Sequence, residues 1–273
     1  MDELERKLTQ AQDTIRQLGS VVVAYSGGVD STLLLALCLE VLEPENVLAV
    51  TARSETYPEA ELRQAEEVAR ALGARLRIVE TRELDDPRFA ANPPDRCYFC
   101  KHQLFGDLWT VAREEGLAAV VYGANADDLG DHRPGMRAAQ ELGGRAPLLE
   151  AGLTKEEVRE ASRRLGLPTW DKPSMACLSS RFPYGTPLTP EALRRVGAAE
   201  AFLREEIGLR QLRVRHHDPV ARLEVPPEEW ERVLAEPARQ RIIERLRELG
   251  YLYVALDLAG FRSGSLNDAL KPR

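Results

Sequence analysis

Apolar positions follow two patterns along the chain: short continuous runs, and longer stretches in which they recur every three or four residues. The recurring pattern predicts helices, and the continuous runs predict buried strands. Before residue 186 the predicted strands cover residues 21–25, 46–52, 74–80 and 118–123. The main predicted helices cover residues 3–18, 58–72 and 134–142, and a leucine-rich helix follows the first strand. Because strands alternating with helices form a parallel sheet, we predict an α/β fold with a doubly wound parallel sheet.

The pattern changes after two prolines, Pro187 and Pro190. The apolar pattern after these prolines predicts a second, smaller domain with an α+β fold. Its predicted elements are a helix at 190–206, strands at 212–215, 221–225 and 251–256, and charged helices up to residue 249. We therefore predict two domains, at residues 1–186 and 187–273.

Composition narrows the classes of protein that the chain can belong to. The 273 residues, 44% of them hydrophobic and 30% charged, can form a large and a small core. The net charge of −7 disfavours a broad nucleic-acid surface but permits a local basic pocket. No charged-then-apolar leader is evident, and no apolar run approaches the ~20 residues that span a membrane, so we expect a cytoplasmic protein. Four cysteines in a reducing compartment suggest metal or sulfur chemistry more than disulfides.

A glycine-rich loop joins the first predicted strand to the helix that follows it. Its candidate nucleotide-binding residues are Ser26, Gly27, Gly28, Asp30 and Ser31. Adjacent glycines let amide N–H groups at the helix start point at a phosphate, and a carboxylate beside phosphates calls for a bridging Mg²⁺. The Walker spacing and its lysine are absent, and the stretch instead resembles the PP-loop, SGGxDS, of enzymes that split ATP between its α and β phosphates. The alternative is a Gly-Gly turn with capping serines.

Three cysteines outside the predicted core could carry chemistry. Cys97 and Cys100 form a CxxC pair that leads into a helix ending near residue 115, and Cys177 lies in an irregular Pro-, Ser- and Gly-rich loop at 171–186. The pair alone fits a zinc half-site, a redox pair, half of an iron–sulfur site or two buried thiols. Three thiolates with an open fourth position fit an iron–sulfur cluster or a lone reactive Cys177 better than closed zinc. Cys38, mid-helix among leucines, is predicted to be core.

Polar side chains follow the fourth predicted strand. Asp127 and Asp128 could hold Mg²⁺ or order the loop through Asx turns. Further on, Thr154 and Glu157 have the spacing of a capping box. Lys155 beside them opposes the helix dipole, which suggests either a nearby anion or a solvated lysine.

Arginines recur near the end of the chain. Arg213 and Arg215 alternate on a predicted strand and so share one face, and Arg262 follows the last strand. Three guanidinium groups could converge on one phosphate. The alternative is a solvated strand face.

Several motifs together resemble the LarE family, the ATP-dependent sulfur transferases of nickel-pincer nucleotide synthesis. They are SGGVDS, GANADD, LTKEEVR, PSMACLSSRFPYG, RVRHHDPVARLEV and DLAGFRSGSLN, which span most of the chain. The resemblance implies that the enzyme adenylates a carboxylate of pyridinium-3,5-dicarboxylic acid mononucleotide, releases pyrophosphate, and then delivers sulfur to give a thiocarboxylate and AMP. In some members the cysteine that corresponds to Cys177 gives up its sulfur and becomes dehydroalanine, whereas others bind a 4Fe-4S cluster through three cysteines. The cysteines present here match the cluster type.

The resemblance also implies roles for individual residues. The implied catalytic residues are Cys177 and Lys101. The further implied nucleotide-binding residues are Thr51, Gly123, Asn125 and Lys155. The implied substrate-site residues are Ser180, Arg181, Glu200 and Glu224, with Arg213, Arg215 and Arg262 at the phosphate. The implied metal ligands are Cys97, Cys100 and Cys177 for 4Fe-4S, and Asp30 and Asp128 for Mg²⁺.

The same resemblance implies cofactors and partners. We expect ATP, Mg²⁺ and a 4Fe-4S cluster, a sulfide or other sulfur donor, transient contacts with other enzymes of nickel-pincer synthesis, and a homo-oligomer. Residues 1–186 would bind ATP, and residues 187–273 would bind substrate and support assembly. Two alternatives stay open: a 4Fe-4S-dependent tRNA thiolase, and a non-catalytic ATP-binding or metal-stabilised module. The acidic charge and the 6% aromatic content count against an RNA surface.

Overall fold

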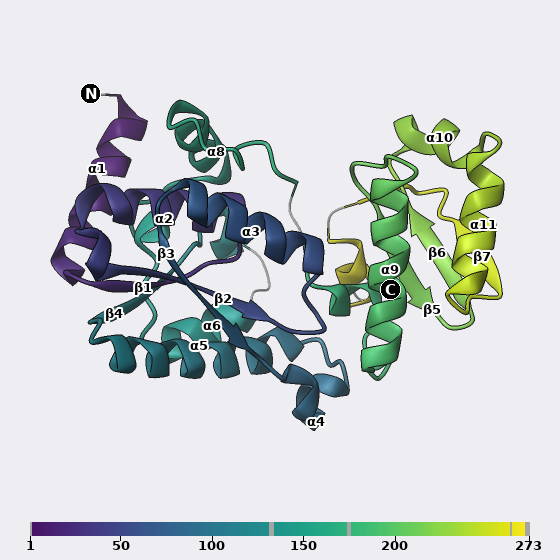
Figure 1. The fold of residues 1–273 in the computed structure, drawn as a ribbon, viewed down its shortest axis with the longest axis horizontal. Helices are drawn as coiled ribbons and strands as arrows, with labels where there is room; N and C mark the ends of the chain where they lie inside the picture. The colour runs from purple at the N-terminus through teal and green to yellow at the C-terminus, as the bar shows by residue number, and fades with distance from the viewer. Residues whose placement is uncertain (1, 131–133, 174–175, 263, 271–273) are drawn as a thin grey trace. The chain divides into compact units, whose positions relative to one another are not determined.

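The computed structural model describes residues 2–130, 134–173, 176–262 and 264–270. Ser174, Met175 and Ser263, which belong to two of the motifs, lie outside these ranges. The chain forms two compact units (Figure 1). The first consists of Met1–Phe89 and Asp95–Met175, and the second of Ala90–Pro94 and Ala176–Arg273.

The units do not divide where the domain boundary was predicted. That boundary lies at residue 186, whereas the second unit already begins at Ala176 in this part of the chain. The physical reason is Arg181, which is fully buried and bonded to Glu200 of the second unit. The roles assigned to the two domains stay predictions.

The first unit is an α/β sandwich around a parallel sheet. Its strands are β1 (Val21–Ala24), β2 (Val47–Arg53), β3 (Arg75–Glu80) and β4 (Ala119–Tyr122). Its main helices are α1 (Glu3–Leu18), α2 (Val29–Val41), α3 (Glu59–Ala71), α5 (Arg96–Glu115), α6 (Pro134–Glu141) and α8 (Lys155–Arg164). Two short helices are α4 (Pro87–Ala90) and α7 (Pro147–Glu150). The strand order β3-β2-β1-β4, parallel throughout, confirms the predicted α/β class.

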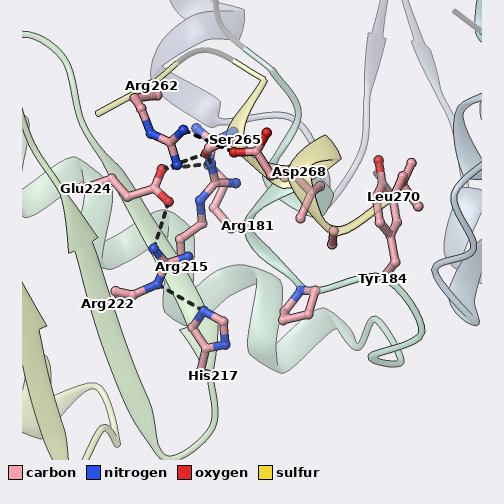
Figure 2. A pocket seen from close by; sticks show the side chains of 13 residues that line it. Arg181, Tyr184, Arg215, His217, Arg222, Glu224, Arg262, Ser265, Asp268 and Leu270 are labelled. Atoms are coloured by element: carbon pink, nitrogen blue, oxygen red, sulfur yellow. Dashed lines mark hydrogen bonds and ion pairs between the residues drawn. The ribbon is translucent and has the colours of Figure 1, made fainter. Parts of the chain in front are cut away.

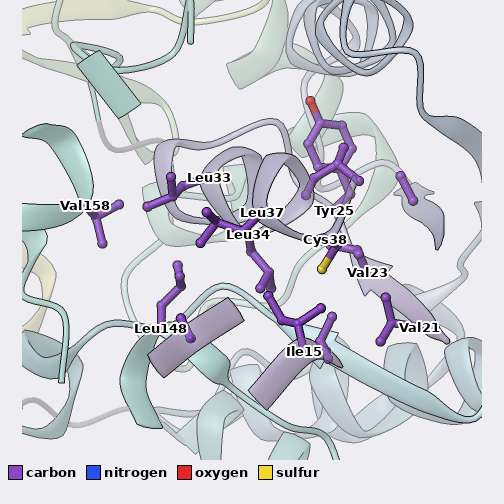
Figure 3. Packing of buried hydrophobic residues seen from close by; sticks show 14 of the residues in the cluster. Ile15, Val21, Val23, Tyr25, Leu33, Leu34, Leu37, Cys38, Leu148 and Val158 are labelled. Carbon is purple, nitrogen blue, oxygen red and sulfur yellow. The ribbon is translucent and has the colours of Figure 1, made fainter. Parts of the chain in front are cut away.

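Helices cover both faces of this sheet, and the strand sequences explain why. Val21 and Val23 of β1 pack with α1, α2 and α8, while Val22 faces the opposite side, with Phe105 and Leu108 of α5. Figure 3 shows the first of these cores, in which Cys38 lies fully buried, as the sequence predicted. Since parallel strands bring their carboxyl ends to one edge, the loops after β1, β2 and β4 lie together there.

The second unit has a small mixed sheet. Its strands are β5 (Arg213–His217), β6 (Val220–Glu224) and β7 (Tyr253–Leu256), in the order β5-β6-β7. Its helices are α9 (Pro190–Glu205), α10 (Trp230–Leu234) and α11 (Ala238–Glu248). β5 and β6 are antiparallel, and β7 joins parallel to β6. In the described parts of the chain, no helix has both the length and the apolar character needed to cross a membrane.

Candidate active site

The glycine-rich loop between β1 and α2 has the conformation that its sequence predicts. Gly27 has a φ of +63°, and a Cβ at this position would lie 2.6 Å from the Ala65 Cβ of α3. A larger residue would therefore be strained and would clash. Gly28 is the N-cap of α2. Glycine has no side chain that could accept from the first backbone N–H groups of the helix, so these groups are available to an anion.

Asp30 lies in the first turn of α2 and accepts two side-chain hydrogen bonds. Lys155 Nζ donates to Asp30 Oδ2 at 2.5 Å, and Asn125 Nδ2 donates to Asp30 Oδ1 at 3.0 Å. Lys155 is two-thirds buried and so is not simply a solvated lysine. The structure thus brings three predicted nucleotide-binding residues into one contact.

The paired aspartates after β4 have distinct contacts. Asp127 Oδ2 accepts from the backbone N–H of Lys155 at 2.9 Å, and Asp128 Oδ2 accepts from the backbone N–H of Asn125 at 3.0 Å. Both therefore order the loop, one of the two roles left open by the sequence. Asn125 connects Asp128 to Asp30, so two carboxylates lie near the phosphate-binding loop, and oxygen donors of this kind suit Mg²⁺.

A cavity of about 140 Å³ lies against the start of α2. It is lined by Ser26, Gly28, Val29, Asp30, Tyr57, Glu61, Lys155, Lys172 and Pro173. Sequence reasoning missed Tyr57, Glu61 and Lys172. Tyr57 and Glu61 follow β2 at the carboxyl edge of the sheet, where ligands bind, and that position was the available signal. Lys172 lies in the irregular loop at 171–186 but was given no role from sequence.

A second cavity in the same unit, of about 320 Å³, also borders the loop. Its lining includes Ser26, Ser31, Cys97, Lys101 and Gly123, so residues predicted for nucleotide binding and for catalysis lie around one space. The remaining lining residues are Ala24, Phe105, Tyr122, Ala124, Asp128, Pro134, Gly135, Met136 and Ala139.

Two predicted nucleotide-binding residues have structural explanations. A Cβ on Gly123 would lie 2.7 Å from the backbone nitrogen of Ser31, so glycine lets β4 approach α2. Thr51 is buried in β2 and is absent from the described linings of both cavities.

The CxxC pair lies in the first two turns of α5. Cys97 borders the larger cavity. The Cys100 thiol donates to Glu83 Oε1 at 3.8 Å, and that buried carboxylate also accepts from Thr81 Oγ1 at 3.2 Å.

The third predicted iron ligand, Cys177, belongs to the second unit and is half-buried. Within the described ranges, no three His, Cys, Asp or Glu side chains gather as a metal site. Thiol donors have the chemistry that iron–sulfur clusters require, and each of the three cysteines is at least partly accessible within its own unit.

The second unit contains a cavity of about 440 Å³ (Figure 2). Arg215 and Arg262, two of the predicted phosphate ligands, line it together with Arg181 and Glu224. Sequence reasoning missed other lining residues, namely Pro183, Tyr184, His217, Arg222, Ser265, Leu266, Asp268, Ala269 and Leu270.

Arg213 has a different environment from the other two arginines. It is not among the described lining residues, and its Nη1 donates to Leu212 O at 2.8 Å while its guanidinium lies 5.0 Å from the centre of the Phe261 ring. Burial, together with the charge of Arg181, lowers the pKa of Arg213 to about 10. With Arg213 and Arg215 both less than 10% exposed, this strand face is not solvated.

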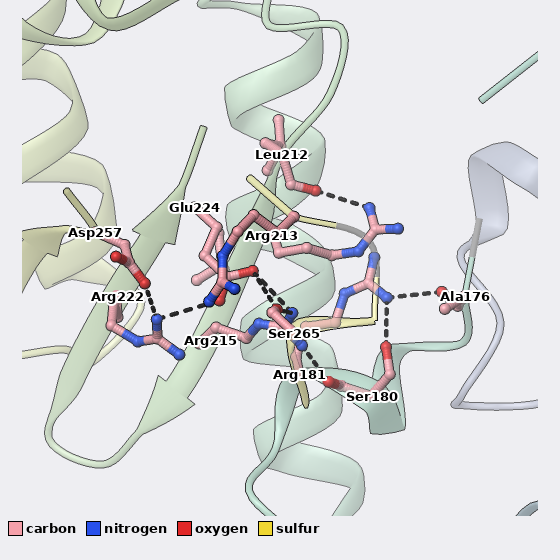
Figure 4. Close-up of polar contacts among 12 residues, drawn as sticks. Ala176, Ser180, Arg181, Leu212, Arg213, Arg215, Arg222, Glu224, Asp257 and Ser265 are labelled. Atoms are coloured by element: carbon pink, nitrogen blue, oxygen red, sulfur yellow. Dashed lines mark hydrogen bonds and ion pairs between the residues drawn. The ribbon is translucent and has the colours of Figure 1, made fainter. Parts of the chain in front are cut away.

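Arg181 holds the backbone of the Cys177 loop, defined here as residues 176–181 (Figure 4). It pairs with Glu200 through two bonds, each of 2.8 Å. Its Nη1 donates to Ala176 O at 2.7 Å and to Cys177 O at 3.1 Å. Burial would raise the pKa of Glu200, but Arg181, Arg204 and the Val214 amide outweigh it and lower that pKa to about 2.

Arg215 provides a second support for the same loop. Its Nη1 donates to Ser180 O at 2.6 Å, and its Nη2 donates to Glu224 Oε2 at 2.8 Å. The Ser180 hydroxyl in turn donates to Cys177 O at 2.8 Å. The implied substrate-site residues therefore lie in one polar network around Cys177, in which Arg215 Nε has no hydrogen-bond partner in the part of the chain that is described.

A parallel sheet whose first strand leads through SGGVDS into a helix defines a PP-loop enzyme that uses ATP. Residues 2–91 match the NAD synthase family, which has this loop. The chain is 40% identical over 270 residues to the pyridinium-3,5-bisthiocarboxylic acid mononucleotide synthase of Lactiplantibacillus plantarum, covering 99% of this chain and 97% of that protein. It belongs to that family, the LarE-type synthases.

Two further relatives match most of the chain. An uncharacterized protein of Synechocystis sp. is 45% identical over 267 residues, 98% of this chain and 99% of its own length. An uncharacterized protein of Methanocaldococcus jannaschii is 28% identical over 243 residues, 89% of this chain and 91% of its own length.

Proposed function

We propose that this protein is a sulfur transferase that uses ATP to adenylate a carboxylate of pyridinium-3,5-dicarboxylic acid mononucleotide. It then delivers sulfur to form a thiocarboxylate and release AMP. The full-length similarity to the Lactiplantibacillus plantarum synthase supports this substrate class. It favours sulfur transfer in nickel-pincer nucleotide synthesis over a tRNA thiolase or a non-catalytic module.

The observation that carries the proposal is the pair of cavities beside the PP-loop. Asp30 and Lys155 line the smaller cavity, and Cys97 and Lys101 line the larger. Ser26 of the loop lines both, so candidate phosphate-binding groups and candidate sulfur-handling groups lie on either side of one loop residue. A carboxylate is a poor electrophile because its leaving group would be oxide. As an acyl-adenylate it expels AMP, and a sulfur nucleophile can then attack.

Asp30 and Asp128 would hold Mg²⁺ near the phosphates, where the ion would neutralise charge on ATP. Lys155, already bonded to Asp30, lies where it can orient a phosphate oxygen.

Cys97, Cys100 and Cys177 would hold a 4Fe-4S cluster, which when bound supplies an iron that can carry sulfide. In the alternative route, Cys177 gives up its own sulfur. In either route, Arg181 and Ser180 fix the backbone around Cys177. A sulfide or other sulfur donor completes the reaction.

We assign substrate binding to the second unit. Its 440 Å³ cavity contains Arg215 and Arg262, whose charge suits the phosphate of a mononucleotide. Arg213 stays a proposed phosphate ligand from sequence. We further propose a cytoplasmic homo-oligomer that contacts other enzymes of nickel-pincer synthesis transiently.

Pyrophosphate release in the presence of the dicarboxylic mononucleotide tests the proposal. We expect release to require ATP, Mg²⁺ and that substrate, with thiocarboxylate appearing when sulfide is added to anaerobically prepared protein. Pyrophosphate release that tRNA stimulates and the mononucleotide does not would refute the assignment.

A further inference from the structure

Lys172 is a buried cation at the PP-loop to which the proposed reaction assigns no role. Its Nζ donates to Gly27 O at 3.1 Å and lies 2.8 Å from Glu61 Oε2. Only 10% of its side chain is exposed. A lysine in this position has lost most of its hydration and depends on Glu61 for compensation.

The smaller cavity has Lys172 and Lys155 in its lining, each paired with a carboxylate that also lines it. The partner of Lys155 is Asp30, which the proposed function uses for Mg²⁺. The partner of Lys172, Glu61, has no such use. A cavity of about 140 Å³ is small for a nucleoside, but its two cations and the uncapped start of α2 suit a compact anion.

We propose that Lys172 binds the pyrophosphate end of ATP, opposite Lys155, and that Glu61 is the counter-ion it keeps while the cavity is empty. This inference rests on the proposed function. In adenylation, a carboxylate oxygen of the substrate bonds to the α-phosphorus, and the bond from that phosphorus to the bridging oxygen breaks. The electron pair leaves on pyrophosphate, so a cation at that group stabilises the charge that develops.

The arrangement makes opposite predictions for the two members of the ion pair. Removing Lys172 takes away a charge-assisted contact to the anion, whereas removing the Glu61 charge takes away a competitor for Lys172 and a like charge beside the phosphates. If the pair were only structural, both substitutions would weaken the loop and both would reduce binding.

Calorimetric titration of inorganic pyrophosphate with Mg²⁺ tests this without requiring turnover. We expect Lys172→Met to weaken binding about tenfold. Lys172→Arg should retain most of the affinity, and Glu61→Gln should tighten binding about fivefold. Arg75→Met is the control, because it removes one positive charge from the same unit at the start of β3, where Arg75 pairs with Glu115. It should leave binding unchanged.

Weaker binding in Glu61→Gln, or unchanged binding in Lys172→Met, would overturn the inference. If Lys172→Met does not fold, Glu61→Gln still tests the inference, because a purely structural ion pair would make that variant bind more weakly instead of more tightly; circular dichroism checks that each variant folds. The assay contains no carboxylate substrate or sulfide. A wild-type protein that binds pyrophosphate as predicted but forms no thiocarboxylate would therefore refute the proposed function and leave this inference standing.

Discussion

Replacing Glu200 by glutamine should destabilise the second unit by about 3 kcal/mol at neutral pH. The carboxylate is 1% exposed and accepts bonds from Arg181, from Arg204 and from the Val214 amide. Its pKa is lowered from 4.5 to about 2, and that difference corresponds to about 3 kcal/mol in favour of the folded, ionised state. The figure agrees with the roughly 3–5 kcal/mol lost when one partner of a buried ion pair is removed.

The pH dependence has a definite sign. Because folding lowers the pKa of Glu200, its stabilisation is complete above about pH 4.5 and disappears as the pH falls towards 2. The glutamine variant has no such proton to bind. The difference in stability between wild type and Glu200→Gln should therefore be largest at neutral pH and shrink between pH 5 and pH 3.

Urea unfolding at several pH values measures this difference, and hydrogen exchange in α9 and β5 assigns it to the second unit. Glu248→Gln is the control, since Glu248 forms an exposed ion pair with Arg245. Removing that pair should change the free energy of unfolding too little to resolve. A Glu200→Gln effect below about 1 kcal/mol at pH 7, or one independent of pH, would refute the role given to this ion pair.

Four further outcomes follow from the site. Gly27→Ala should lose ATP binding and about 1–3 kcal/mol of stability, because the new Cβ meets Ala65 and the φ is positive; a normal ATP affinity by calorimetry would contradict this. Asp30→Ala should keep the fold but abolish Mg²⁺-dependent pyrophosphate release, and release at the wild-type rate would remove its metal role. Arg262→Ala should weaken the mononucleotide more than ATP in binding assays, whereas equal weakening would point to misfolding. Cys177→Ala should lose iron in protein prepared without oxygen and Cys38→Ala should not, while equal iron contents would exclude Cys177 as a ligand.

The fold followed from the sequence because its strands and helices differ in hydrophobic pattern. β1 and β2 are buried on both faces and read as continuous valine-rich runs, and α1 has a regular apolar face. The mixed sheet of the second unit was located but not its topology, because the parallel pairing of β7 with β6 depends on contacts distant in sequence.

Sequence reasoning could name only those site residues that belong to recognisable motifs. Asp30, Asn125 and Lys155 were expected near phosphate, and the side chains of Asn125 and Lys155 both donate to Asp30. Lys172 was not predicted, because it bonds to the carbonyl of a loop residue 145 positions earlier in the chain. The local sequence around such a lysine does not differ from that around a solvated lysine. Arg181 was expected at the substrate, but its contacts show that it also holds the Cys177 backbone, and burial of an arginine cannot be seen in a one-dimensional pattern.

In the proposed reaction, ATP cleavage and sulfur delivery act on one carboxylate. The most direct test is a single anaerobic incubation of the protein with MgATP, the dicarboxylic mononucleotide and sulfide, followed by mass spectrometry of the nucleotides. We predict replacement of a carboxylate oxygen by sulfur, with AMP and pyrophosphate formed in equal amounts to the thiocarboxylate. Bound ATP that yields neither pyrophosphate nor a sulfur-containing product, with iron-loaded and with iron-free protein alike, would contradict the account.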